Sequence, residues 1–166
     1  SDLVHRVNRN ALKRALRVDK LRIAALEAIL RLYSNPERLA RRLPVLGHMI
    51  RSASDIEAQA GRILPVIAHA LAGRATVTIE KCESQVGSGS LPADRLPSFA
   101  LAIRPSVMKR QASVRVEALS RVFRALPVPV VGRVHDGVFY LDLRCLDDED
   151  DFLNQLDHLQ LDVDTK

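Results

Sequence analysis

The chain has 166 residues, a length that fits one domain, or a small domain with a helical lead-in. Hydrophobic residues make up 47% and charged residues 27%, the balance of an ordinary globular protein that needs no metal or disulfide to fold. No apolar run reaches 18 residues and no signal-peptide pattern opens the chain, so we expect neither a membrane span nor a secretory leader.

The net charge of +5 is unevenly distributed. Residues 1–51 hold twelve Lys or Arg against four acids, a net +8, whereas residues 147–166 hold eight acids against one Lys, a net −7. The excess of positive charge in the N-terminal part favours an anionic partner. Two solvated surfaces that partly complement each other explain the same pattern, and charge alone leaves both interpretations open.

The two cysteines, Cys82 and Cys145, are isolated and have no CxxC spacing. They are typical of a reducing compartment, so we expect a cytoplasmic protein without a disulfide framework. The five histidines have no HExxH or other metal-ligand spacing, and we expect no metal site. They are His5, His48, His69, His135 and His158.

A helix is expected in the stretch from Leu12 to Tyr33, which is rich in Ala, Leu, Arg and Lys. Either Asp19 caps a helix that begins after it, or the helix runs through and places Arg14 and Arg17 on one face. Two guanidinium groups on one face beside a helix start can hold a phosphate-like anion. The other interpretation is a solvated basic surface, and the spacing does not decide between them.

Two further helices are expected before the apolar pattern changes. Asn35 followed by Pro36 is typical of a helix start, and this short helix extends to about Arg42. In residues 45–71 apolar side chains recur at intervals of three and four, which predicts one amphipathic helix with a buried stripe.

After Gly73 the pattern becomes an alternation of β-branched residues, which predicts strands. Asp136-Gly137 between two apolar runs is a strong hairpin signal. The order β-β-α-β-β-α predicts a small α+β fold, with a four-stranded, mainly antiparallel sheet and helices on one face. The expected strands are residues 75–82, 97–104, 130–134 and 138–143, and the helices are residues 113–126 and a last one from Asp147 or Asp148 to about Leu156.

The segment Gly87-Ser88-Gly89-Ser90 joins the first two strands. It is not a Walker loop, because no Gly-Lys-Ser/Thr follows and a strand rather than a helix comes next. It is therefore either a plain connection or an active-site or interface loop. The chain has no nucleophile elbow and no lysine in a small-residue loop after a strand, so it carries no complete catalytic apparatus of its own.

Several blocks of the sequence carry a resemblance to a known family. They are Leu12–Leu21, Ala24–Ala28, Leu30–Tyr33, Ser84–Pro92, Leu96–Ser98, Pro127–Arg133, Asp136-Gly137 and Leu141–Leu146. These blocks closely resemble bacterial L-seryl-tRNA(Sec) selenium transferases, the selenocysteine synthases. They occur in the order of that family and extend from Leu12 to about Leu156.

The resemblance implies the C-terminal part of a fold-type-I pyridoxal-phosphate enzyme. In such an enzyme residues 1–72 would form an interdomain helical arm, residues 73–158 the small C-terminal domain, and residues 159–166 an acidic tail. The parent would convert seryl-tRNA(Sec) into selenocysteinyl-tRNA(Sec), with selenophosphate as the donor, as a homo-oligomer.

The same resemblance implies roles for a few residues. The cofactor lysine lies upstream of this chain, so the fragment contains no catalytic residue and is expected to be inactive alone. Arg14 and Arg17 match two family arginines that hold a phosphate-like anion, here selenophosphate or the phosphate that is released. The segment Gly87–Ser90 matches a family motif for which the resemblance implies no particular role.

Other interpretations stay open at this point. A different pyridoxal-phosphate enzyme with a similar small domain, such as a cystathionine-type lyase, does not account for the arginine pair or the Gly-Ser-Gly-Ser-Leu-Pro block. A stand-alone RNA-binding α+β module is disfavoured by the scarcity of aromatic residues on the expected strands. A pure oligomerisation module is the remaining alternative.

Overall fold

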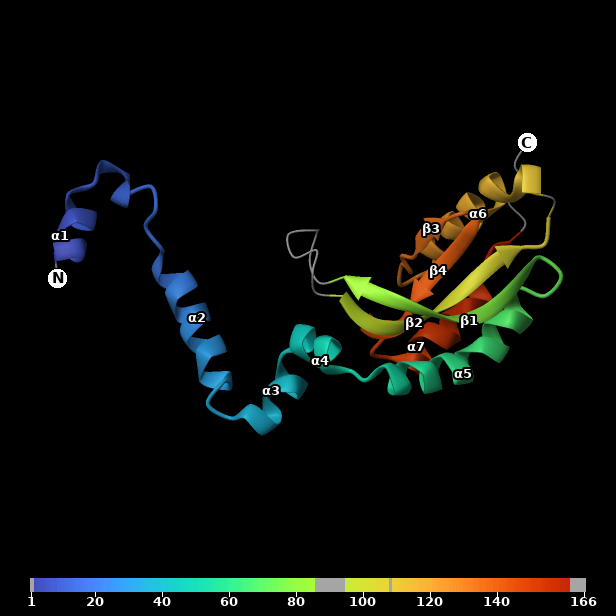
Figure 1. The fold of residues 1–166 in the computed structure, drawn as a ribbon, viewed down its shortest axis with the longest axis horizontal. Coiled ribbons are helices and arrows are strands. Elements are labelled where there is room, and N and C mark those ends of the chain that lie inside the picture. The colour runs from blue at the N-terminus through green and yellow to red at the C-terminus, as the bar shows by residue number, and fades with distance from the viewer. Residues whose placement is uncertain (1, 86–94, 108, 162–166) are drawn as a thin grey trace. The chain divides into compact units, whose positions relative to one another are not determined.

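The computed structural model in Figure 1 describes residues 2–85, 95–107 and 109–161. It divides the chain into two compact units, Ser1–Gly47 and His48–Lys166. This boundary lies earlier than residue 72, the expected end of the helical arm. The reason is that the helix before residue 72 packs on the sheet of the second unit and supplies part of its core.

Short helices joined by turns make up the first unit. The stretch from Leu12 to Tyr33 is not one helix, because Asp19 caps a new helix: its carboxylate accepts a hydrogen bond from the Arg22 backbone N–H at 2.9 Å. Of the two alternatives for this stretch, the capped one is therefore confirmed. The helices are α1 (Asp2–Arg9), α2 (Lys20–Leu32), α3 (Pro36–Arg42) and α4 (Pro44–Ile50), with a 3₁₀ turn, η1 (Ala11–Lys13), after α1.

Helix α2 is rich in apolar residues, yet none of its residues is buried. Leu21 is 83% exposed and Leu26 is 58% exposed. Glu27 and Arg31 form an ion pair at 2.7 Å across one helical turn, which supports an exposed helix only weakly. Apolar as α2 is, no helix in the described part of the chain is long and apolar enough to cross a membrane.

The second unit contains the four-stranded antiparallel sheet that the sequence predicts, in the order β1-β2-β4-β3 (Figure 1). The predicted hairpin is also present: Asp136 and Gly137 have φ of 47° and 72°, the left-handed pair that a tight two-residue turn requires. The strands are β1 (Ala75–Gln85), β2 (Arg95–Pro105), β3 (Arg133–His135) and β4 (Val138–Asp142).

Side chains alternate between large and small along β2, and this alternation separates the two faces of the sheet. Leu101 and Ile103 point to the face covered by helices, where Ile103 pairs in register with Phe139 of β4. Ala100 and Ala102 point to the other face and are buried although no described helix covers them. Their larger neighbours in register shield them, which leaves that second face open and mainly polar.

Within the second unit, the described helices cover the first face of the sheet. They are α5 (Ala53–Ala70), α6 (Lys109–Arg124) and α7 (Glu149–Asn154), and α7 is followed by a 3₁₀ turn, η3 (Gln155–His158). The prediction of one helix over residues 45–71 is wrong, because the chain leaves helical geometry between Ile50 and Ala53. There the Ser52 hydroxyl accepts a hydrogen bond from the Asp55 backbone N–H at 3.1 Å and starts α5.

Two arginines explain why the helix breaks at this point. Arg51 donates hydrogen bonds to the backbone carbonyls of Leu143 and Arg144, at 3.0 and 2.9 Å. Arg144 in turn donates to the carbonyls of His48 and Arg51, at 2.8 and 3.0 Å. The two segments, about ninety residues apart in sequence, are thus joined to each other, and a continuous helix would lose these bonds. The second segment is the 3₁₀ turn η2 (Leu143–Cys145) that follows β4.

Candidate functional site

The two arginines singled out by sequence lie between η1 and α2 rather than within a helix. Both are exposed, and the Arg17 backbone N–H donates to the Arg14 carbonyl at 3.4 Å, which forms a turn. They therefore share a turn and not a helix face. Their side chains emerge one turn before the N-terminus of α2, the helix end that favours anions.

The neighbouring charges do not neutralise this arginine pair. The Asp19 carboxylate caps α2 and also lies 3.4 Å from the Arg22 Nε atom. The Lys13 Nζ atom donates to the Asn8 carbonyl at 2.8 Å. Within the described residues, Arg14 and Arg17 make no ion pair, so their guanidinium groups are available to a ligand.

The other predicted segment, Gly87-Ser88-Gly89-Ser90, lies outside the described residues. The strands on either side of it are described: β1 ends at Gln85 and pairs there with Arg95 of β2.

The open face of the sheet contains a hollow near that end, with a volume of about 320 Å³. We call it the sheet-face hollow. Asp142, the last residue of β4, is one of the charged residues that line it. The residues used below are Cys82, Ser84, Gly132, Arg133, Tyr140 and Asp142.

Three donors fix the Asp142 carboxylate. The Ser84 hydroxyl donates at 2.5 Å, the Ser98 hydroxyl at 2.7 Å and the Arg144 backbone N–H at 3.1 Å. Ser84 comes from β1, Ser98 from β2 and Arg144 from the turn after β4, so the sheet register brings them together. All three donors are neutral groups, and Asp142 makes no ion pair with any described residue. The carboxylate is thus fixed in place by neutral donors.

Two more side chains shape the hollow. The Arg133 guanidinium lies over the Tyr140 ring, 5.5 Å from the ring centroid, which is a cation–π arrangement. Burial and, to a smaller extent, the nearby Asp142 carboxylate raise the pKa of the Cys82 thiol to about 11. Cys82 is therefore a protonated thiol at neutral pH and a poor nucleophile.

Gly132 at the edge of the hollow allows the chain to lie against β4. A Cβ atom at this position would come within 2.5 Å of both the Phe139 ring and the Tyr140 carbonyl oxygen. We expect Gly132→Ala to lower the free energy of unfolding in urea by about 2 kcal/mol.

Gly61→Ala is the matched control, because a Cβ at Gly61 in α5 would meet nothing within 4 Å. This second variant should gain about 0.5–1 kcal/mol, since alanine favours the helix. Equal stability of the two variants would contradict the close approach at Gly132.

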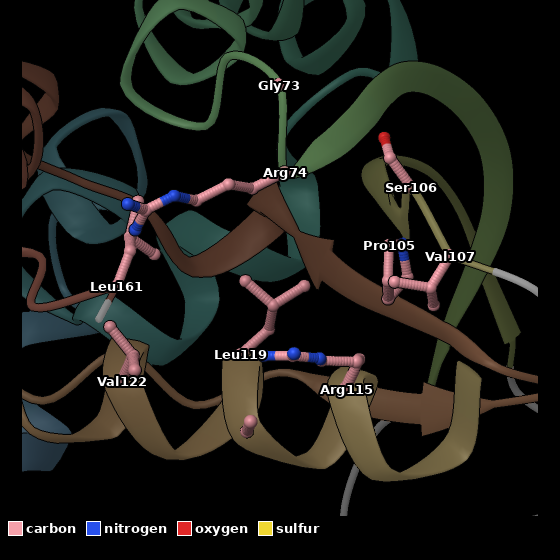
Figure 2. A pocket seen from close by; sticks show the side chains of 10 residues that line it. Gly73, Arg74, Pro105, Ser106, Val107, Arg115, Leu119, Val122 and Leu161 are labelled. Atoms are coloured by element: carbon pink, nitrogen blue, oxygen red, sulfur yellow. The ribbon is translucent and has the colours of Figure 1, made fainter. Parts of the chain in front are cut away.

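A second hollow of about 320 Å³ lies where β1 and β2 meet α6 (Figure 2). Leu119 of α6 projects into it, while Arg74 and Arg115 extend along its sides in Figure 2. The Ser106 hydroxyl points away from the hollow in the same view. The described lining contains no acid–base pair and no nucleophile directed inward, so this hollow has no chemistry of its own.

Lys13, Lys20 and Lys81 are the lysines whose side chains the structure describes, and none of them lines a described hollow. Likewise, in the described part of the chain, no three His, Cys, Asp or Glu side chains gather closely enough to hold a metal ion.

Sequence reasoning did not identify the Asp142 cluster. Its signal is present in the alternation of polar residues along β1, which puts Cys82 and Ser84 on one face. This alternation alone does not predict the cluster. The register of β1, β2 and β4 must also be known, because the register brings Ser84 and Ser98 to Asp142.

The fold and these sites define a small helix-backed α+β domain with a polar open sheet face, preceded by a basic helical lead-in. A family model described as L-seryl-tRNA selenium transferase matches residues 1–147. The chain belongs to the L-seryl-tRNA selenium transferase family.

Curated relatives support the same assignment. A protein of Methylocella silvestris named L-seryl-tRNA(Sec) selenium transferase is 50% identical over 97% of this chain and 34% of its own length. Proteins of the same name from Klebsiella pneumoniae and Rhizobium meliloti are 51% and 48% identical, each over 93% of this chain and 32% of their own length. The chain thus spans about a third of the length of the curated relatives it matches.

Proposed function

We propose that this chain is the C-terminal part of a transferase that converts seryl-tRNA(Sec) into selenocysteinyl-tRNA(Sec), with selenophosphate as the selenium donor. The observation that carries the proposal is the identity of about 50% to proteins named for this activity, over nearly the whole chain. The parent would be a pyridoxal-phosphate enzyme and a homo-oligomer.

The cofactor would be held by parts of the parent outside the residues described here. Pyridoxal phosphate supplies the electron sink for such chemistry when it is bound. What this chain contributes is anion binding and a structural domain. The two free thiols, Cys82 and Cys145, fit a reducing compartment, which supports a cytoplasmic parent.

Within this function, Arg14 and Arg17 would position the selenophosphate anion or the phosphate that leaves. Both side chains are exposed, neither makes an ion pair with a described residue, and both lie just before the N-terminus of α2. A guanidinium group stays charged at every physiological pH and can pair with two oxygens of one oxyanion.

The proposal is tested with the full-length protein and with this chain alone. The full-length protein should form selenocysteinyl-tRNA from seryl-tRNA(Sec) and selenophosphate, measured by selenium incorporation into the acylated tRNA. The isolated chain should form none, and equimolar pyridoxal phosphate should give no lysine-bound cofactor after borohydride reduction. A full-length protein without product would overturn the function. A stoichiometric lysine adduct on this chain would overturn the placement of the cofactor anchor.

A further inference from the structure

The open face of the sheet is the surface of the second unit that the fold leaves uncovered. Helices α5, α6 and α7 occupy the opposite face, and within the second unit no described helix lies over Ala100, Tyr140 and Asp142. Three of the sequence blocks that resemble the family meet here, although they are far apart along the chain. They contribute Ser84, Arg133 and Asp142, and none of these has a part in the function proposed above.

The Asp142 carboxylate is arranged like a binding group. Ser84, Ser98 and the Arg144 backbone N–H hold it in one position, so little side-chain entropy remains to be lost when a partner binds. It makes no ion pair with a described residue, although Arg133 lines the same hollow. By contrast, Glu83 at the edge of the same hollow already pairs with Arg95 at 2.8 Å. A rigid, unpaired carboxylate in a hollow of about 320 Å³ fits a positively charged group.

The charges also select the kind of partner. A nucleic acid would bring phosphates next to Asp142 and Glu83, which like-charge repulsion disfavours. Tyr140 is the one aromatic residue that the described lining offers for base stacking, and the Arg133 guanidinium already lies over its ring. A protein surface that carries a basic side chain meets neither obstacle.

The length of the relatives supplies the candidate partner. About two thirds of each relative lies outside the region that this chain matches. Interfaces between domains of one chain are more polar than obligate subunit interfaces, as this face is. We propose that the sheet-face hollow docks the remaining two thirds of the full-length protein, with an arginine or lysine of that part paired with Asp142. This inference rests on the proposed function insofar as the chain belongs to a longer transferase.

Accessibility of the Cys82 thiol tests the docking directly, because Cys82 lines the hollow. The rate of maleimide labelling at Cys82 is measured by peptide mass spectrometry in this chain and in the full-length protein. Each rate is divided by the rate of the same thiol in urea-unfolded protein. We expect labelling in the full-length protein to be at least tenfold slower than in the chain alone.

Two variants of the full-length protein identify the carboxylate as the anchor. Asp142→Asn removes the charge, retains an oxygen that can accept the Ser98 and Arg144 hydrogen bonds, and presents an amide NH₂ that can donate to the Ser84 hydroxyl. Because the carboxylate itself raises the pKa of the Cys82 thiol, the same substitution is also made in this chain alone, and the rise in Cys82 labelling should be at least threefold larger in the full-length protein. Asp136→Asn is the matched control, because Asp136 is an exposed carboxylate in the β3–β4 turn outside the hollow. It should leave the labelling unchanged.

Three other outcomes would each contradict the proposal. Equal Cys82 labelling in the chain and in the full-length protein would show an open face, and this comparison needs no variant. Protection that appears only when tRNA is added would assign the face to RNA. Protection that Asp142→Asn leaves intact would remove the carboxylate from the interface. Failure of the proposed function can be told apart from failure of the docking proposal. In that case the full-length protein forms no selenocysteinyl-tRNA, but its Cys82 is still protected from labelling.

Discussion

Replacement of both Arg14 and Arg17 by alanine in the full-length protein is expected to slow selenocysteinyl-tRNA formation by about 100-fold or more. Each guanidinium would contribute a charge-assisted interaction of about 1.5 kcal/mol or more to the bound anion, and two such losses correspond to about two orders of magnitude. The loss should appear mainly as a raised KM for selenophosphate, because the arginines would hold the anion before the reaction as well as during it.

Two further variants separate anion binding from a general loss of positive charge. Arg38→Ala with Arg41→Ala removes two exposed arginines of α3 that are also three residues apart, and it should leave the rate unchanged. Arg14→Lys with Arg17→Lys keeps the charge but loses the planar fork, and it should recover only part of the rate. A normal rate in the double alanine variant would end the anion-site assignment.

Arg144→Ala is expected to have the largest effect on stability, a loss of about 3–5 kcal/mol in the free energy of unfolding. The side chain is 5% exposed and donates to the backbone carbonyls of His48, Arg51 and Pro97. Its removal leaves these part-buried bonds unmade and opens a cavity between the two segments that it joins. Urea denaturation followed by circular dichroism measures the loss.

Arg62→Ala provides the comparison for Arg144→Ala. Arg62 is an exposed arginine of α5 that pairs with Glu149 at 2.7 Å, and surface ion pairs of this kind contribute little. Its removal should barely move the denaturation midpoint. Arg144→Met separates the two causes at the buried site, because it fills most of the volume but donates no hydrogen bond. If Arg144→Ala cost no more than Arg62→Ala, the reciprocal arginine contacts would have no role in stability.

The sheet was predictable from sequence because its signals are local. The alternation in β1 and β2 and the Asp136-Gly137 turn are each contained within about ten residues, and all three are confirmed. The last helix also follows a local rule: the Asp148 carboxylate accepts a hydrogen bond from the Asp151 backbone N–H at 2.9 Å. Capping and alternation need no knowledge of the rest of the fold.

The features that sequence reasoning missed depend on distant contacts. The break between α4 and α5 arises from Arg51 and Arg144, whose partners are about ninety residues away. The Asp142 cluster likewise needs three strands in register before its serines and carboxylate meet. The role of Arg14 and Arg17 stays a prediction, since the resemblance and not the local spacing assigns it.

The absence of buried side chains in helices α1, α2 and α3 has a thermodynamic consequence. The denaturant dependence and heat capacity of unfolding scale with the surface that becomes exposed, and these helices have little left to expose. A melting curve of this chain therefore monitors the segment from His48 onward. Substitutions at Arg14 and Arg17 should leave that curve unchanged, because both side chains are exposed in this chain.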